Sequence, residues 1–237
     1  MEIDSVISFL QEVDTHEIAK MFRGHASYEW ELLPSIARIN HDSLESNYEN
    51  GGWESIETDL LNSFKQHAVR YISKEPKNKL EWMIQAQHHG VPTRLLDWSS
   101  NPLKALYFAV ENPAYDSENG SVYLLSPSSW SPTPYGVDLD SIITMKAFYP
   151  DIINDRVASQ EGCFTVFPQR TDLKSFKPLK HGFAPETDIV NLSKISVAKD
   201  AKPKIRKQLD KLGINDLSIF PDLDGIAKSL RRRFGVL

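Results

Sequence analysis

The sequence predicts an α+β fold, a single domain in which helices flank a mixed or antiparallel sheet. The 237 residues are 41% hydrophobic and 25% charged, which is ordinary for a globular chain that buries one core. Stretches with helical periodicity and short apolar stretches typical of strands both occur along the chain. They do not alternate with the regular βαβ rhythm of a doubly wound sheet, so we favour α+β.

Apolar residues at helical spacing predict helices over residues 3–11, 54–72, 79–89, 203–212 and 222–234. A turn or helix start is expected at Pro34, and Gly90 with Pro92 ends the helix at 79–89. A further helix is expected at 103–110. The segment before it, residues 99–102, reads Ser-Ser-Asn-Pro, which combines capping side chains with a proline suited to the first helical turn.

Strands are predicted at 20–24, 121–125, 163–167 and 188–190, and residues 93–98 form a short ordered segment before the helix at 103–110. Prolines and serines predict a surface loop over 126–136. These elements divide the chain into a helical lead-in at 1–20, a core domain at 21–195 and a C-terminal helical segment at 196–237 packed on the core.

Composition excludes several protein classes. No run of about 18 apolar residues is present, and the N-terminus lacks the basic start and apolar run of a secretory signal. We therefore expect a cytoplasmic protein with no membrane partner. Cys163 is the only cysteine, which rules out an intramolecular disulfide. Clusters of basic residues at 199–207 and 231–233 could contact nucleic acid, but a solvated helix face is the simpler interpretation at a pI near 5.8.

Four blocks of residues stand out. They are Phe22-Arg23-Gly24 with residues 33–38, then residues 87–98 continuing into 101–109, then Gln160-Glu161 with 162–165, and finally residues 219–225. In content and order these blocks resemble the FRG-domain family, which takes its name from the Phe-Arg-Gly tripeptide. The second block is the most specific of the four.

The polar residues of these blocks are the candidate binding residues. The guanidinium of Arg23 can fork onto a carboxylate or a diphosphate, and Gly24 permits close approach of a ligand. The second block adds side chains that donate protons, stack on rings or begin a helix. Together with Arg23 and Gly24 of the first block, the candidate binding residues are Arg23, Gly24, His88, His89, Arg94, Asp97, Trp98 and Ser100.

Each of these residues also has a purely structural interpretation. Arg23 could form a buried pair with Asp97 or another acid, and Arg94 could pair with Asp97. Ser99 could be a helix cap, and the histidines could be satisfied core groups. We expect no metal site, because neighbouring histidines on a helix point about 100° apart. Cys163 lies in an apolar run, where a cysteine is usually inert.

The order of the blocks also resembles that of the ADP-ribosyltransferases. The resemblance implies NAD as the cofactor, with Arg23, Ser99, Gln160 and Glu161 as catalytic residues. In that superfamily the arginine contacts the phosphates or ribose, the serine orients the arginine or ribose, and the late glutamate stabilises an oxocarbenium-like transition state. Here residues 97–100 replace the usual Ser-Thr-Ser run. Whether Gln160 or Glu161 takes the acidic role is left open.

The leading hypothesis is therefore an NAD-using ADP-ribosyltransferase-like enzyme, with a small-molecule nucleotide and a protein or nucleic-acid acceptor as partners. We expect such an enzyme to serve as the effector of a bacterial toxin or anti-phage system, a context inferred from where such domains are expected to occur. One alternative is a ligand-sensing or protein-interaction module without catalysis. Another is a metal-independent hydrolase using His88 or His89 with Asp97. On the first hypothesis Arg23, the segment 88–99 and Gln160-Glu161 line one cleft.

Overall fold

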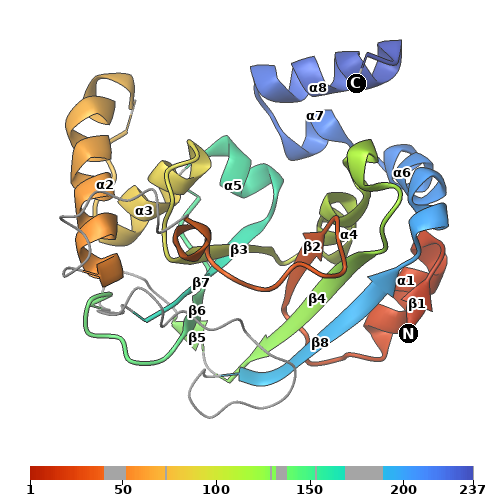
Figure 1. The fold of residues 1–237 in the computed structure, drawn as a ribbon, viewed down its shortest axis with the longest axis horizontal. Coiled ribbons are helices and arrows are strands. Elements are labelled where there is room, and N and C mark those ends of the chain that lie inside the picture. The colour runs from red at the N-terminus through yellow and green to blue at the C-terminus, as the bar shows by residue number, and fades with distance from the viewer. Residues whose placement is uncertain are drawn as a thin grey trace.

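A computed structural model of the chain describes residues 1–39, 52–72, 74–128, 130–131, 138–152, 154–168 and 189–236. Its centre is an eight-stranded sheet in the order β1-β8-β4-β2-β3-β7-β6-β5 (Figure 1). The pairs β1–β8 and β5–β6 are parallel, and the others are antiparallel. The sheet is therefore mixed with helices around it, and the predicted α+β class is confirmed.

The strands are mostly short. Their bounds are β1 Glu2–Ile3, β2 Met21–His25, β3 Leu95–Ser99, β4 Gly120–Pro127, β5 Trp130–Ser131, β6 Lys146–Phe148, β7 Gly162–Val166 and β8 Ile189–Val197. The α-helices are α1 Val6–Asp14, α2 Gly52–Ala68, α3 Lys79–His88, α4 Pro102–Val110, α5 Asp155–Ser159, α6 Lys202–Lys211, α7 Asp216–Ile219 and α8 Leu223–Phe234. Short 3₁₀ helices include Ser35–Arg38 and Pro113–Tyr115.

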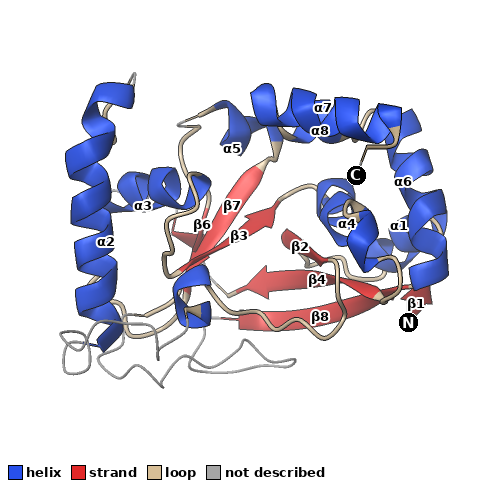
Figure 2. Cartoon of the chain, turned by 45° about the horizontal axis from the view of Figure 1, so that its top comes forward, coloured by secondary structure: helices blue, strands red, loops and turns tan. Residues whose placement is uncertain are grey.

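Two groups of helices cover different halves of the sheet (Figure 2). Helices α1, α4 and α6 pack on the half built from β1, β8, β4 and β2, in a buried cluster that includes Phe9, Leu106 and Val122. Helices α2 and α3 pack near β3 and β7, in a second cluster that includes Trp82 and Phe164. The boundary between the two halves runs between β2 and β3, which pair through Phe22 and Ser99 alone among the described residues.

The α-helices of nine or more residues lie close to where the sequence predicts them, whereas the differences concern strand lengths and short elements. Strand β5 falls within the predicted loop at 126–136, although residues 129 and 132–136 of that loop lie outside the described residues. The strand expected at 188–190 continues to Val197, and residue 188 lies outside the described residues. Strands β1 and β6 and helices α5 and α7 were not predicted. They contain two to five residues, too few for an apolar period to appear.

Among the described residues, every helix is too short or too polar to span a lipid bilayer.

Candidate functional site

A cleft of about 770 Å³ lies where β2 and β3 separate. Its walls come from β2, β3, α3 and α5, from the segment that ends in the 3₁₀ helix Ser35–Arg38, and from the 3₁₀ helix Pro113–Tyr115. Phe220, which follows α7, closes one side. Volumes of about 300–1,000 Å³ are typical of small-molecule sites, so the cleft has room for a nucleotide-sized ligand.

Arg23 lies in this cleft, on β2, and is held at two points. Its Nε donates a hydrogen bond to Nε2 of His25 at 3.0 Å, and its Nη1 donates to the carbonyl oxygen of Asp97 at 2.5 Å. Burial lowers the pKa of the guanidinium, and the charge of Asp97 opposes that effect. Asp97 therefore bonds Arg23 through its backbone, while its carboxylate acts on the arginine electrostatically.

His25 supports Arg23 as a neutral imidazole. Its Nδ1 lies 3.3 Å from the carbonyl oxygen of Trp30, which can only accept, while its Nε2 accepts from Arg23. The proton must then be on Nδ1. Burial and the charge of Arg23 lower the pKa of His25 to about 3, in agreement with this tautomer. His25 thus holds the Arg23 guanidinium in place and does not carry protons at neutral pH.

Asp97 is the carboxylate at the floor of the cleft. Its side chain is exposed in the cleft, and its Oδ1 accepts a hydrogen bond from Nε2 of Gln87 at 2.6 Å. The surrounding protein displaces bulk water and raises the pKa of the carboxyl, an effect that Arg23 and the Gln87 amide oppose. Within the described residues Asp97 forms no direct ion pair with Arg23 or Arg94.

Two further arginines line the cleft, which also contains the acids Glu29, Glu31 and Glu111. Arg38, at the end of its 3₁₀ helix, is exposed and makes no hydrogen bond or ion pair within the described part of the chain. Arg156 on α5 stacks over the ring of Phe220, 4.7 Å from its centroid. Both charges act on Asp97 and favour its ionised form. Trp30 and Tyr115, in edge contact at 5.0 Å between centroids, add aromatic surface.

The two adjacent histidines have different surroundings. His88 lines the cleft, and its buried Nδ1 has no hydrogen-bond partner among the described residues. Burial and the nearby charge of Arg156 lower its pKa to about 4. His89 is exposed, stacks on His88 at 4.8 Å and does not line the cleft. Neither ring is hydrogen-bonded to Asp97 within the described residues, which weakens the hydrolase alternative.

The polar groups of residues 99–101, the segment before α4, are hydrogen-bonded to other groups of the chain. Ser99 is buried, donates from Oγ to the carbonyl oxygen of Gln160 at 2.7 Å and accepts from the backbone N–H of Asn101 at 3.0 Å. Asn101 in turn caps Leu103. Trp98 and Ser99 line the cleft, whereas Ser100 does not. The backbone N–H groups of Asn101 and Leu103 at the start of α4 therefore already have hydrogen-bond partners within the chain.

Gln160 and Glu161 point in different directions. Gln160 lines the cleft, and its Nε2 donates to the carbonyl oxygen of Ile219 at 3.4 Å. Glu161 does not line it. Its carboxylate accepts from Nζ of Lys104 at 2.9 Å and from Nδ2 of Asn101 at 3.1 Å, interactions that lower its pKa. Its backbone has a φ of 47°, an uncommon conformation for a residue with a side chain.

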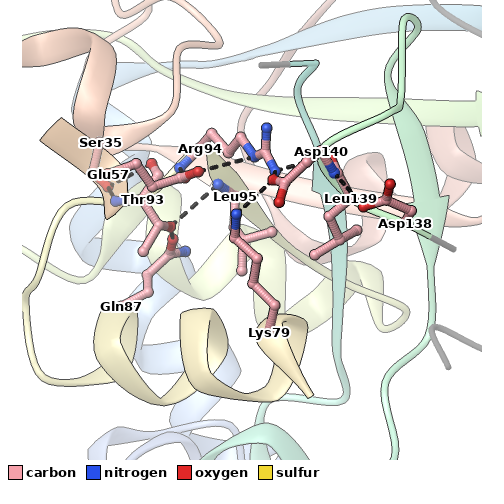
Figure 3. Close-up of polar contacts among 10 residues, drawn as sticks. All are labelled: Ser35, Glu57, Lys79, Gln87, Thr93, Arg94, Leu95, Asp138, Leu139 and Asp140. Atoms are coloured by element: carbon pink, nitrogen blue, oxygen red, sulfur yellow. Dashed lines mark hydrogen bonds and ion pairs between the residues drawn. The ribbon is translucent and has the colours of Figure 1, made fainter. Parts of the chain in front are cut away.

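Arg94 lies outside the cleft, in the partly buried ionic network of Figure 3. Its Nε is 3.2 Å from Oε2 of Glu57, and its Nη2 is 3.2 Å from Oδ1 of Asp140. The backbone N–H of Arg94 also donates to Oε1 of Glu57 at 3.0 Å. Burial raises the pKa of Glu57, and the charge of Arg94 opposes the rise. The network joins α2 to the start of β3.

Several cleft residues are absent from the sequence-based candidate set. Gln87 and Arg38 fall within blocks of the resemblance, so their signal was present. His25, Trp30, Tyr115 and Arg156 carry no local pattern that distinguishes them, because only the fold brings them together. Across the described residues, no cluster of three or more His, Cys, Asp or Glu side chains is placed to hold a metal ion.

Comparison with known proteins finds one match, to a protein-family model. No curated protein and no solved structure matches the chain. The model of the FRG domain matches residues 19–118, which include the first two sequence blocks, strands β2 and β3 and the residues Arg23, Gln87 and Asp97. The chain thus contains an FRG domain, as its sequence blocks predicted, and this domain supplies the floor of the cleft.

Proposed function

We propose that the cleft binds a nucleotide and that the protein is an NAD-using ADP-ribosyltransferase-like enzyme. The observation that carries the proposal is the cleft itself, where Arg23, Arg38 and Arg156 surround the carboxylate of Asp97. Guanidinium groups suit a diphosphate, and exposed aromatic surface such as that of Trp30 suits a planar base. One cleft of this size offers both kinds of contact.

The sheet order adds support. The strand with Arg23, the strand with Asp97 and the strand after Gln160 are β2, β3 and β7, which are neighbours in the order β2-β3-β7. The three segments that resemble the ADP-ribosyltransferase blocks therefore converge, although they are far apart in sequence. The context of a bacterial toxin or phage-defence effector belongs to this proposal and rests on where such domains are expected to occur.

We propose that Asp97, and not Glu161, is the carboxylate that acts on the substrate. Transfer breaks the bond between ribose C1′ and the nicotinamide nitrogen, and the electron pair leaves with neutral nicotinamide. The positive charge that develops on the sugar is stabilised by a nearby carboxylate. An acceptor's electron pair then forms the new bond to C1′, and the acceptor loses its proton. Glu161 is engaged with Lys104 and Asn101 outside the cleft, whereas Asp97 faces into it.

The test is release of nicotinamide from NAD by the purified protein, followed by chromatography, together with NAD binding by calorimetry. We expect Asp97→Asn to lower the rate about 10²–10³-fold, the usual cost of removing one group that stabilises transition-state charge. Arg23→Lys should weaken binding, because an ammonium cannot replace a forked guanidinium. Loss of activity with Glu161→Gln but not with Asp97→Asn would contradict the assignment of Asp97.

The non-catalytic alternative also has a specific observation in its favour, namely that the only acid of the late block, Glu161, is turned away from the cleft. A ligand-sensing module would bind NAD or a related nucleotide at the arginines without consuming it. Binding by calorimetry with no nicotinamide released over hours would establish this alternative in place of the enzyme.

A further inference from the structure

We infer that Gln87 is a positioning residue for Asp97, and that Thr93 fixes the Gln87 amide so that its N–H groups face the carboxylate. The inference deepens the proposed function, on which its activity readout depends, by naming the residues that would orient the acting carboxylate. It rests on a chain of hydrogen bonds whose directions can be assigned from the chemistry of each donor and acceptor.

The chain of hydrogen bonds begins at a backbone amide. The N–H of Leu95 can only donate, and it donates to Oγ1 of Thr93 at 3.2 Å. The Thr93 hydroxyl therefore uses a lone pair on Leu95, and its own proton is directed to Oε1 of Gln87 (Figure 3). Thr93 is buried, so water does not compete for this proton.

The direction of the Gln87 amide follows from that bond. Because Oε1 accepts from Thr93, Nε2 is turned toward Asp97 and donates to Oδ1 at 2.6 Å. The opposite orientation would place an amide oxygen against a carboxylate oxygen, which are both acceptors. The Asp97 carboxylate thus excludes the flipped amide, and the Thr93 hydroxyl, which donates to Oε1, holds the amide in place as a donor to Asp97.

The consequence for Asp97 is that its two oxygens differ. Oδ1 is occupied by Gln87, while Oδ2 makes no hydrogen bond within the described residues and remains available to a ligand. The charged groups that act on this carboxyl are Arg23 on β2, Arg38 at the end of its 3₁₀ helix and Arg156 on α5, with the Cys163 thiol near it on β7. Gln87 is its one neutral donor in the described structure.

Thr93 also ties this arrangement to the arginine side of the cleft. Its backbone N–H donates to Oγ of Ser35 at 3.0 Å, and its carbonyl oxygen accepts from Oγ of Ser35 and from the backbone N–H of Ile36. Ser35 and Ile36 begin the 3₁₀ helix that carries Arg38. A single residue therefore sets the positions of both the Gln87 amide and the segment that bears Arg38.

The experiment follows the carboxyl of Asp97 directly, by carbon-13 NMR of aspartate-labelled protein titrated with acid, with the resonance assigned through Asp97→Asn. In Gln87→Met and in Thr93→Val we expect the pKa of Asp97 to rise, since the bond that favours its ionised form is lost. Thr93→Ser retains the hydroxyl and should restore the value of the unaltered protein. Gln11→Met, at an exposed glutamine on α1 outside the cleft, is the matched control and should leave the titration unchanged.

A second readout uses the proposed reaction. Gln87→Met should lower kcat about 10–100-fold, because a misplaced catalytic group loses its alignment. An Asp97 titration that moves while NAD is neither bound nor consumed would uphold the positioning role and refute the proposed function. An Asp97 titration unchanged in folded Gln87→Met would overturn the positioning role even if NAD is consumed. Gln87 is only partly buried, so this variant keeps the test open if Thr93→Val does not fold.

Discussion

At the scale of single residues, Arg94 and Asp97 of the second sequence block have different roles. Arg94 and Asp97 are three positions apart, yet Arg94 is buried among acids from other segments while Asp97 faces the cleft. The predicted alternative of an Arg94–Asp97 ion pair is therefore wrong, and the partners of Arg94 are Glu57 and Asp140. Arg94 thus holds β3 in place, and Asp97 is available to a ligand.

Arg94→Met should cost on the order of 3–5 kcal/mol of unfolding free energy, because it leaves the Glu57 carboxylate buried without its cation. Since burial raises the pKa of Glu57 above its unfolded value, the loss should be smaller at low pH, where Glu57 is protonated, and should grow as the pH rises through the folded pKa. Urea denaturation at several pH values measures this.

The matched control for Arg94 is Lys79→Met. Lys79 pairs with Asp140 at 2.5 Å in the same network but is partly exposed, so its loss should cost no more than about 1 kcal/mol. Adding Glu57→Gln to Arg94→Met should recover part of the stability. Equal stability of Arg94→Met and the unaltered protein would show that the buried pair is not the anchor of β3.

At the scale of elements, Gly24 determines how closely α4 approaches β2. A Cβ atom built on Gly24 would lie 1.9 Å from the carbonyl oxygen of Ala105 and 2.6 Å from the amide nitrogen of Ala109. Both are backbone atoms of α4, which cannot move aside alone. The sequence suggested that this glycine serves ligand approach. It does line the cleft, but the closest contact at its Cα is with the helix.

Gly24→Ala should therefore destabilise the protein by about 1–3 kcal/mol, the usual cost of overpacking, or by more if α4 must shift as a unit. Thermal and chemical denaturation measure the change. Gly162→Ala is the matched control, because a Cβ there would meet its nearest atom at 3.5 Å, an ordinary contact. A similar cost for both variants would mean that the effect comes from strand glycines in general and not from the α4 contact.

At the scale of the whole molecule, the cleft depends on segments that are distant in sequence. Its lining runs from Phe22 to Phe220, so the C-terminal segment completes a site whose floor lies in the FRG domain. Tyr107 on α4 donates to Oδ1 of the buried Asp216 on α7 at 2.5 Å, and Arg232 on α8 is 3.2 Å from the same oxygen. These contacts attach α7 and α8 to the sheet through α4.

Global stability should fall as the pH is lowered below about 6.5, and two cleft histidines contribute to the fall. The folded pKa values of His25 and His88 lie at about 3 and about 4, below their ordinary value of 6.5. As the pH falls, these histidines are protonated in the unfolded chain before they are protonated in the folded protein. Their contribution to the unfolding free energy is therefore complete above pH 6.5 and is lost as the pH approaches 4. Each histidine contributes at most about 1.4 kcal/mol per pH unit.

The pH dependence can be measured by urea denaturation between pH 7.5 and 4.5. In His25→Gln the unfolding free energy should depend less steeply on pH than in the unaltered protein, because one of the two histidines no longer takes up a proton on unfolding. Equal slopes for the two proteins would show that His25 is not held neutral in the fold.

The sequence by itself determined the fold class, the longer helices and strands, the FRG domain and most of the cleft floor. Those features depend on local information, namely apolar periods, helix caps and contiguous blocks such as residues 87–98. Only the tertiary structure decided that Glu161 turns away while Asp97 faces the cleft, and that His25, Arg156 and Phe220 join Arg23. The direction of a side chain depends on which strand pairs with which and where the sheet separates, and one sequence carries no local pattern for either.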